Sequence, residues 1–84
     1  MKVALMWEAR AAGGRGAELL AWARAQSLPH PPERREVFRA EGERVLVITW
    51  WEAESLSAPL PELPEPDGDL LSRPVHRWRF EAVG

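Results

Sequence analysis

The sequence predicts an α+β fold with a four-stranded antiparallel sheet, built as a single domain over residues 1–84. Two observations lead to this prediction. Segments with strand-like and helix-like apolar spacing follow one another in the order strand, helix, strand, strand, irregular segment, strand. A chain of 84 residues is also too short for two independent cores.

The first predicted strand covers residues 2–9, KVALMWEA. Its side chains alternate, so Val3 and Trp7 face one side of the sheet and Ala4 and Met6 face the other. The turn AGGRG follows, and its glycines tolerate positive φ. An amphipathic helix is then expected at about 16–27.

Prolines divide the rest of the chain. Pro29, Pro31 and Pro32 end the helix. Strands are predicted at 35–40, 43–51 and 75–82, of which ERVLVITWW has the strongest β-branched and aromatic character. Between the last two, PLPELPEPDGD carries four prolines and cannot form a regular helix. The second helix of the pattern is therefore expected to be degenerate and rich in proline.

This order of elements is the ferredoxin-like βαββαβ pattern. Right-handed crossovers lead us to expect the first and third strands side by side and parallel at the centre of the sheet. The triplet WEA occurs at 7–9 and again at 51–53, so both copies would end neighbouring strands at the same edge. Two related halves would explain the repeat, and a chance match of three residues is the alternative.

Composition excludes several classes of protein. The net charge is −2 with interspersed signs, which gives no basic surface for nucleic acid and no polybasic membrane patch. No apolar run approaches the ~20 residues of a membrane span, and the start of the chain is read as a strand, so a cytoplasmic protein is expected. With no cysteine and two distant histidines, neither a metal site nor another cofactor is predicted. The absence of asparagine, the single glutamine and the eight prolines would suit a thermophile, and a GC-rich genome is the alternative source of such a composition.

The strand at 43–51 is apolar on both faces. Ile48 and Trp50 point one way, and Val47 and Trp51 point the other. One helix and a proline-rich segment can cover only one face, and a chain of this size is marginal alone. We therefore expect a homodimer in which two sheets pack against each other.

Two stretches resemble a known family. WEARAAGGRGAELLAW and ITWWEAESLSA look like the first strand, turn and helix, and the third strand, of antibiotic biosynthesis monooxygenase-like proteins in the dimeric α+β barrel superfamily. The resemblance implies a cofactor-independent enzyme or a small-molecule binder. That family often has Glu two residues before the Trp matched by Trp51, and His at the end of the second helix; this chain has Thr49 and about Pro59 there. WEARAA also resembles short bacterial proteins, which implies no activity.

His76, Glu8 and Glu52 are the candidate catalytic residues. The predicted sheet brings His76, at the start of the last strand, close to Glu8 at the end of the first, with Glu52 ending the next strand. A histidine between two carboxylates suits general acid–base chemistry. The alternative is three solvated polar residues at strand ends.

Four tryptophans are candidates for an apolar ligand pocket between sheet and helix: Trp7, Trp50, Trp51 and Trp78. The same side chains would serve equally as core and dimer contacts. GGRG lacks the spacing of a phosphate-binding loop, and the third strand lacks the basic aromatic character of an RNA-binding sheet.

Two classes of function follow. One is a non-catalytic homodimerisation or interaction module, which the absence of asparagine and the missing second helix favour. The other is a protein that binds a small apolar ligand, or a monooxygenase-like enzyme, with a tryptophan-lined pocket. The sequence leaves open whether the protein is an enzyme.

Overall fold

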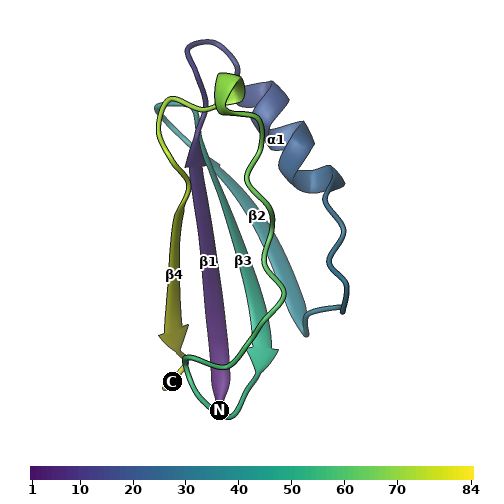
Figure 1. The fold of residues 1–84 in the computed structure, drawn as a ribbon. Helices are drawn as coiled ribbons and strands as arrows, with labels where there is room; N and C mark the ends of the chain where they lie inside the picture. Colours follow the sequence, from purple (N-terminus) through teal and green to yellow (C-terminus); the bar gives the residue numbers. More distant parts are fainter.

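The computed structural model describes residues 1–84 and has the predicted α+β architecture. Four strands form one antiparallel sheet in the order β2-β3-β1-β4 (Figure 1). The elements are β1 (Lys2–Arg10), α1 (Gly16–Ala25), β2 (Arg34–Ala40), β3 (Arg44–Glu52), a 3-10 turn (Gly68–Leu70) and β4 (His76–Glu81). The helix and the four strands each lie within two residues of their predicted ranges. The arrangement is compatible with a ferredoxin-like fold.

The predicted direction of the central strands is wrong. β1 and β3 are neighbours, but they run antiparallel, with Lys2 opposite Glu52 and Arg10 opposite Arg44. The crossover through α1 joins β1 to β2, which run parallel to each other, and β3 is inserted between them. A strand that returns from β2 by a tight hairpin must reverse direction, so β3 opposes both of its neighbours.

The two WEA triplets therefore end their strands at opposite ends of the sheet, not at the same edge. Trp7 lies opposite Val47, whereas Trp51 lies opposite Val3. Both tryptophans nevertheless point to the same face, since both are buried there.

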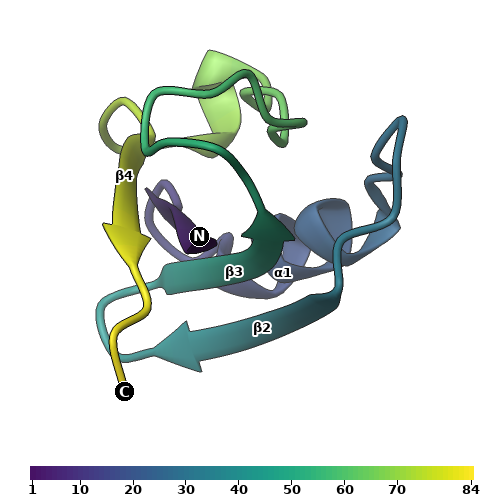
Figure 2. The same ribbon diagram turned by 90° about the horizontal axis from the view of Figure 1, so that it is seen from below.

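One face of the sheet carries the core. Figures 1 and 2 show α1 and the long segment after β3 beside the sheet, with that segment arching over it. Odd-numbered residues of β1 and β3 point into this layer and meet Leu19 and Ala23 of the helix and Leu63 and Leu70 of the segment. Trp7 stacks on Trp22 of α1, with ring centroids 5.9 Å apart. We call this the packed face.

The segment from 53 to 75 replaces the second helix, as the prolines predict. Its only helical element is the 3-10 turn. Two arginines of β4 fix the segment to the sheet: Arg77 donates to the carbonyl of Leu63 at 2.7 Å, and Arg79 donates to the carbonyl of Ala58 at 2.6 Å. Both guanidinium groups also pair with Glu62, each at 3.1 Å. No helix in the chain has the length and apolar character needed to cross a membrane.

The open sheet face as candidate functional site

The second face of the sheet is covered by no element of the chain. It consists of even-numbered residues, because side chains alternate along each strand and the registers bring even residues opposite one another. We call it the open face. From β2 through β3 and β1 to β4, its three rows are Phe38, Leu46, Glu8, His76; Glu36, Ile48, Met6, Trp78; and Arg34, Trp50, Ala4, Phe80.

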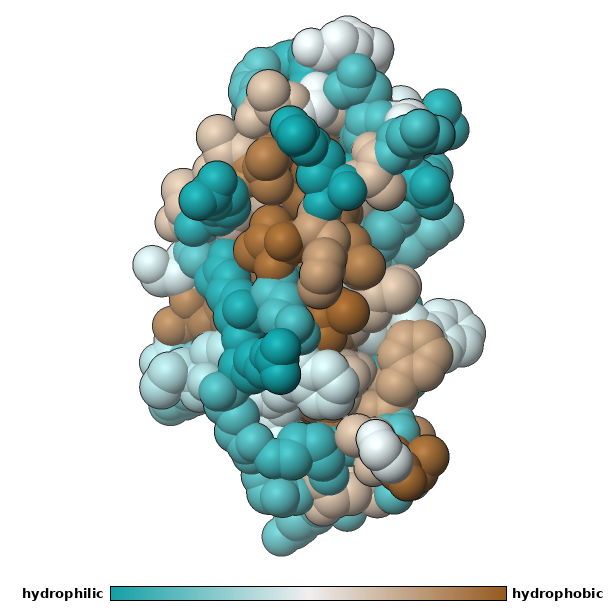
Figure 3. All heavy atoms as spheres, turned by 180° about the vertical axis from the view of Figure 1, so that it is seen from behind, coloured by the Kyte–Doolittle hydropathy of each residue, from teal (hydrophilic) through white to brown (hydrophobic).

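The open face is apolar in its middle. Seen from behind the sheet, brown side chains gather at the centre of the surface and teal ones surround them (Figure 3). Large aromatic side chains stand on both edges: Trp78 is 65% exposed, Phe80 50% and Phe38 45%. Contiguous apolar surface of this kind marks sites of association.

The charged groups on the β2 side of this face are paired within the chain. The Glu36 carboxylate accepts a hydrogen bond from the Arg34 guanidinium at 2.9 Å. Its other oxygen accepts one from the indole Nε1 of Trp50 at 3.0 Å. If another molecule covered this side, the carboxylate and the indole N–H would both keep their hydrogen-bond partners.

A second paired cluster lies at the far end of β1. Arg73 donates from Nη2 to both oxygens of Glu8, at 2.7 and 2.9 Å. His76 lies beside the same carboxylate, with Nδ1 3.7 Å from Oε1. The predicted meeting of Glu8 and His76 is confirmed by their register, but arginine rather than histidine is the main partner of the carboxylate.

Glu52, the third predicted member of this cluster, lies elsewhere. It ends β3 at the opposite end of the sheet, opposite Lys2. Its carboxylate is 2.8 Å from the amino group of Met1, and the hydrogen bond from that group holds the pKa of Glu52 below its usual value. The structure therefore has a carboxylate–histidine pair and no histidine between two carboxylates.

The four candidate tryptophans divide between the two faces. Trp7 and Trp51 are buried in the packed face, and Trp50 and Trp78 lie on the open face. Between sheet and cover, the hollow beside Trp7 measures about 10 Å³, roughly the room of one water molecule. Trp51 donates its indole N–H to the hydroxyl of Thr49 at 2.9 Å, which gives Thr49 a role in packing.

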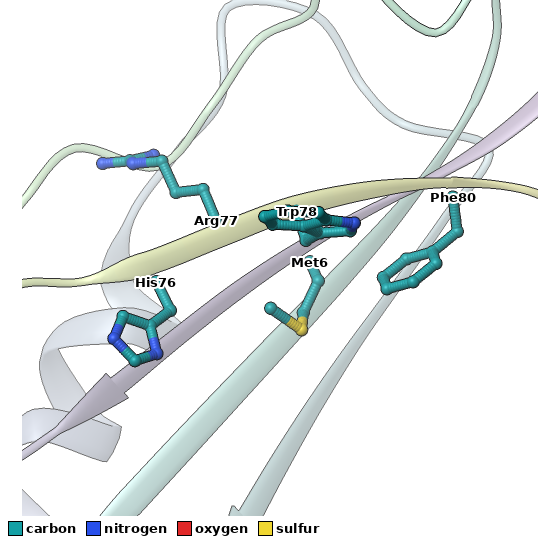
Figure 4. A pocket seen from close by; sticks show the side chains of 5 residues that line it. All are labelled: Met6, His76, Arg77, Trp78 and Phe80. Atoms are coloured by element: carbon teal, nitrogen blue, oxygen red, sulfur yellow. The ribbon is translucent and has the colours of Figure 1, made fainter.

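An apolar hollow of the open face lies along β4. It has a volume of about 530 Å³ and is lined by Met6, His76, Trp78 and Phe80, with the stem of Arg77 at its margin. Figure 4 shows the Arg77 guanidinium leaving on the other side of β4 from His76, Met6 and Phe80. The hollow is broad and shallow, with an aromatic wall and one imidazole at its end.

The glycine turn before α1 has a structural role. The carboxylate of Glu43 occupies the space over Gly16, where a Cβ would meet it. Arg15 bridges the same region by donating to Glu18 at 2.7 Å and to the carbonyl of Asp69 at 2.8 Å. An acidic side chain near a helix start suits the helix dipole and opposes the binding of a phosphate there. No group of three or more possible metal ligands occurs in the chain.

Sequence reasoning missed two contributors to the open face. Arg73 comes from an irregular segment, where no periodic pattern places a side chain. Glu36 gave no signal of its own, because its role depends on the register that puts β2 beside Trp50.

No protein-family model, no curated protein and no solved structure matches the chain.

Proposed function

We propose that this protein is a small homodimerising interaction module whose open face packs against the open face of a second copy. The observation that carries the proposal is the combination of apolar surface and internally paired charge on that face. Met6, Ile48 and Leu46 form a half-buried apolar centre, while Glu36 and Glu8 already have cationic partners. Such a face can be buried without leaving a charged group unpaired.

The thin core of a single copy supports the same conclusion. Only 14 of the 84 residues are buried, and the large buried apolar side chains of the core lie on the packed face. A chain this small gains little stability from one core. A second copy packed on the open face would bury a second apolar surface, as a layer of helices does in larger domains.

The open face is large enough for a stable dimer interface only if the whole face takes part. With strands about 4.8 Å apart and residues about 3.4 Å apart, four strands of seven residues cover about 450 Å² in projection. Side chains make the accessible surface larger than the projection. A stable interface buries roughly 800 Å² on each partner, so the whole open face has to take part.

We propose further that the fold is a ferredoxin-like βαββαβ unit whose second crossover has lost its helix. Kinship with the monooxygenase-like proteins of the dimeric α+β barrel superfamily is part of this proposal, supported by the element order and the stretches WEARAAGGRGAELLAW and ITWWEAESLSA. A buried Thr49 and an exposed Pro59 stand where that family often has Glu and His. These departures favour an interaction module over an enzyme.

Trp78→Glu tests the proposal, with Leu56→Glu as the matched control. Both residues are exposed apolar side chains, but Leu56 lies outside the open face, in the segment after β3. Light scattering after gel filtration should give a dimer mass for the wild type and for Leu56→Glu, and a monomer mass for Trp78→Glu. Equal masses for the two variants would refute a dimer built on this face.

A second candidate function rests on the hollow along β4. Its aromatic wall, and an imidazole held beside the Glu8 carboxylate, suit a flat apolar ligand and proton transfer at His76. Quenching of tryptophan fluorescence by planar aromatic probes tests this candidate. Quenching that is lost in Trp78→Leu and retained in Trp22→Leu would support a ligand site there, and no quenching would exclude it.

A further inference from the structure

We infer that one water molecule binds inside the packed face, between the sheet and the segment that arches over it (Figure 2), and accepts a hydrogen bond from the indole N–H of Trp7. This water links Trp7 of β1 to the carboxylate of Glu62 in the segment. The site lies wholly within one copy of the chain, so the inference stands independently of the proposed dimer.

The first observation is the indole nitrogen of Trp7. The side chain is 2% exposed, and its Nε1 is the only buried side-chain polar atom of the chain without a hydrogen-bond partner. Trp22 stacks on the ring, but an indole N–H lies in the plane of its ring, so stacking does not satisfy it. Nearly all buried donors in folded proteins bond either to a protein group or to an ordered water, because an unpaired donor is costly.

The second observation is the hollow that Trp7 lines. It measures about 10 Å³, which is roughly the room of one water molecule and too little for an organic ligand. Most of its wall is apolar, but Thr49, Glu62 and Arg77 also line it. Buried cavities hold water when they offer two to four polar partners, and purely apolar ones stay dry. The polar groups around this hollow therefore favour a bound water.

Thr49 and Glu62 supply the remaining partners. The Thr49 hydroxyl accepts the indole N–H of Trp51 at 2.9 Å, and its own hydrogen is free to donate. The Glu62 carboxylate accepts from Arg77 at 3.1 Å and has further lone pairs. A water that accepts from Trp7 and Thr49 and donates to Glu62 satisfies all three groups. A small cation is unsuited to the site, because the indole nitrogen can only donate and Arg77 is itself positively charged.

NMR of the isotope-labelled chain tests the site in solution. The assigned indole proton of Trp7 should show a rotating-frame Overhauser cross peak at the water frequency. Exchange of the Thr49 hydroxyl proton with solvent could produce the same peak, so Thr49→Val is the control: it keeps the size of the side chain and removes the hydroxyl. The peak should persist in that variant. A folded wild type without the peak, or a folded Thr49→Val that loses it, would overturn the inference.

Oxygen-17 relaxation dispersion of the solvent provides a second test that leaves Thr49 unchanged. Trp7→Phe should contain one fewer long-lived water than the wild type, because the ring remains and the N–H is removed. Trp22→Phe, on the other side of the stack, is the matched control and should keep the wild-type number. Equal numbers in the wild type and Trp7→Phe would overturn the inference. Urea unfolding checks that each variant folds, and the wild-type cross peak decides the question if Trp7→Phe does not.

Discussion

Trp50 on β3 donates its indole N–H to the carboxylate of Glu36 on β2, across 3.0 Å of the open face. The same carboxylate accepts a hydrogen bond from Arg34. One glutamate thus satisfies both polar groups on the half of the face that would otherwise be costly to cover. This relationship makes the open face suitable for burial.

Removing that acceptor should weaken the dimer. In Glu36→Ala, the indole N–H and the Arg34 guanidinium lose their partner beneath the second copy, and we expect the dimer dissociation constant to rise about tenfold. Glu36→Gln keeps one acceptor oxygen and should lose less. Sedimentation equilibrium measures both, with Glu41→Ala in the exposed hairpin turn as control. An unchanged constant in Glu36→Ala would mean that this side of the face is not covered.

Arg35 should stabilise the end of α1. Its guanidinium donates to the carbonyls of Ala23 and Gln26, both at 2.7 Å, at the helix end, where the Ala23 carbonyl otherwise accepts only a 3.3 Å bond from the Gln26 N–H. We expect Arg35→Ala to lower the free energy of unfolding by about 2 kcal/mol in urea titrations. Arg35→Lys should recover only part of this, because an ammonium group lacks the planar fork. Arg39→Ala, on the same strand but exposed, should have little effect.

The hairpin between β2 and β3 depends on a left-handed backbone. Gly42 has a φ of 77° and Glu43 a φ of 63°. Gly42→Ala should therefore destabilise the protein by about 1 kcal/mol. Gly13→Ala is the matched control, since a Cβ there meets nothing and the backbone is not left-handed. Similar losses of thermal stability in both variants would contradict this account of the turn.

Glu18 gives a pH-dependent contribution to α1. Its hydrogen bond from Arg15 lowers the pKa of Glu18 below the usual value of 4.5. A lowered carboxyl pKa stabilises the folded state above the unfolded value, and the gain is lost as pH falls through the folded pKa. Glu18→Gln should thus be less stable than the wild type at neutral pH, and the difference should vanish in strong acid. Urea midpoints measured across pH check this, with Glu41→Gln as control.

The sequence predicts the elements of this fold well, because alternation and proline placement act locally. The even residues Ile48 and Trp50 were correctly placed on the face opposite Val47 and Trp51, and the proline segment was correctly predicted to replace a helix. Strand direction was predicted wrongly. The right-handed crossover makes β1 parallel to β2, and the tight hairpin after β2 then turns β3 antiparallel to both; the prediction wrongly applied the crossover to β1 and β3.

The candidate site was predicted only in part, for the same reason. The meeting of Glu8 with His76 needed only the antiparallel pairing of β1 with β4, which was anticipated. Glu52 would lie beside them only if β3 ran parallel to β1, and the two strands are antiparallel. The partner that holds Glu8, Arg73, comes from a segment without periodicity, so only the folded structure brings it there.

Sedimentation equilibrium of the unmodified chain, from nanomolar to high micromolar concentration, tests the central claim most directly. Association of two open faces predicts a monomer–dimer equilibrium that shifts fully to dimer within this range, with no larger species. A single monomer mass at every concentration, in a chain that remains folded, would contradict the claim that the open face pairs with a second copy.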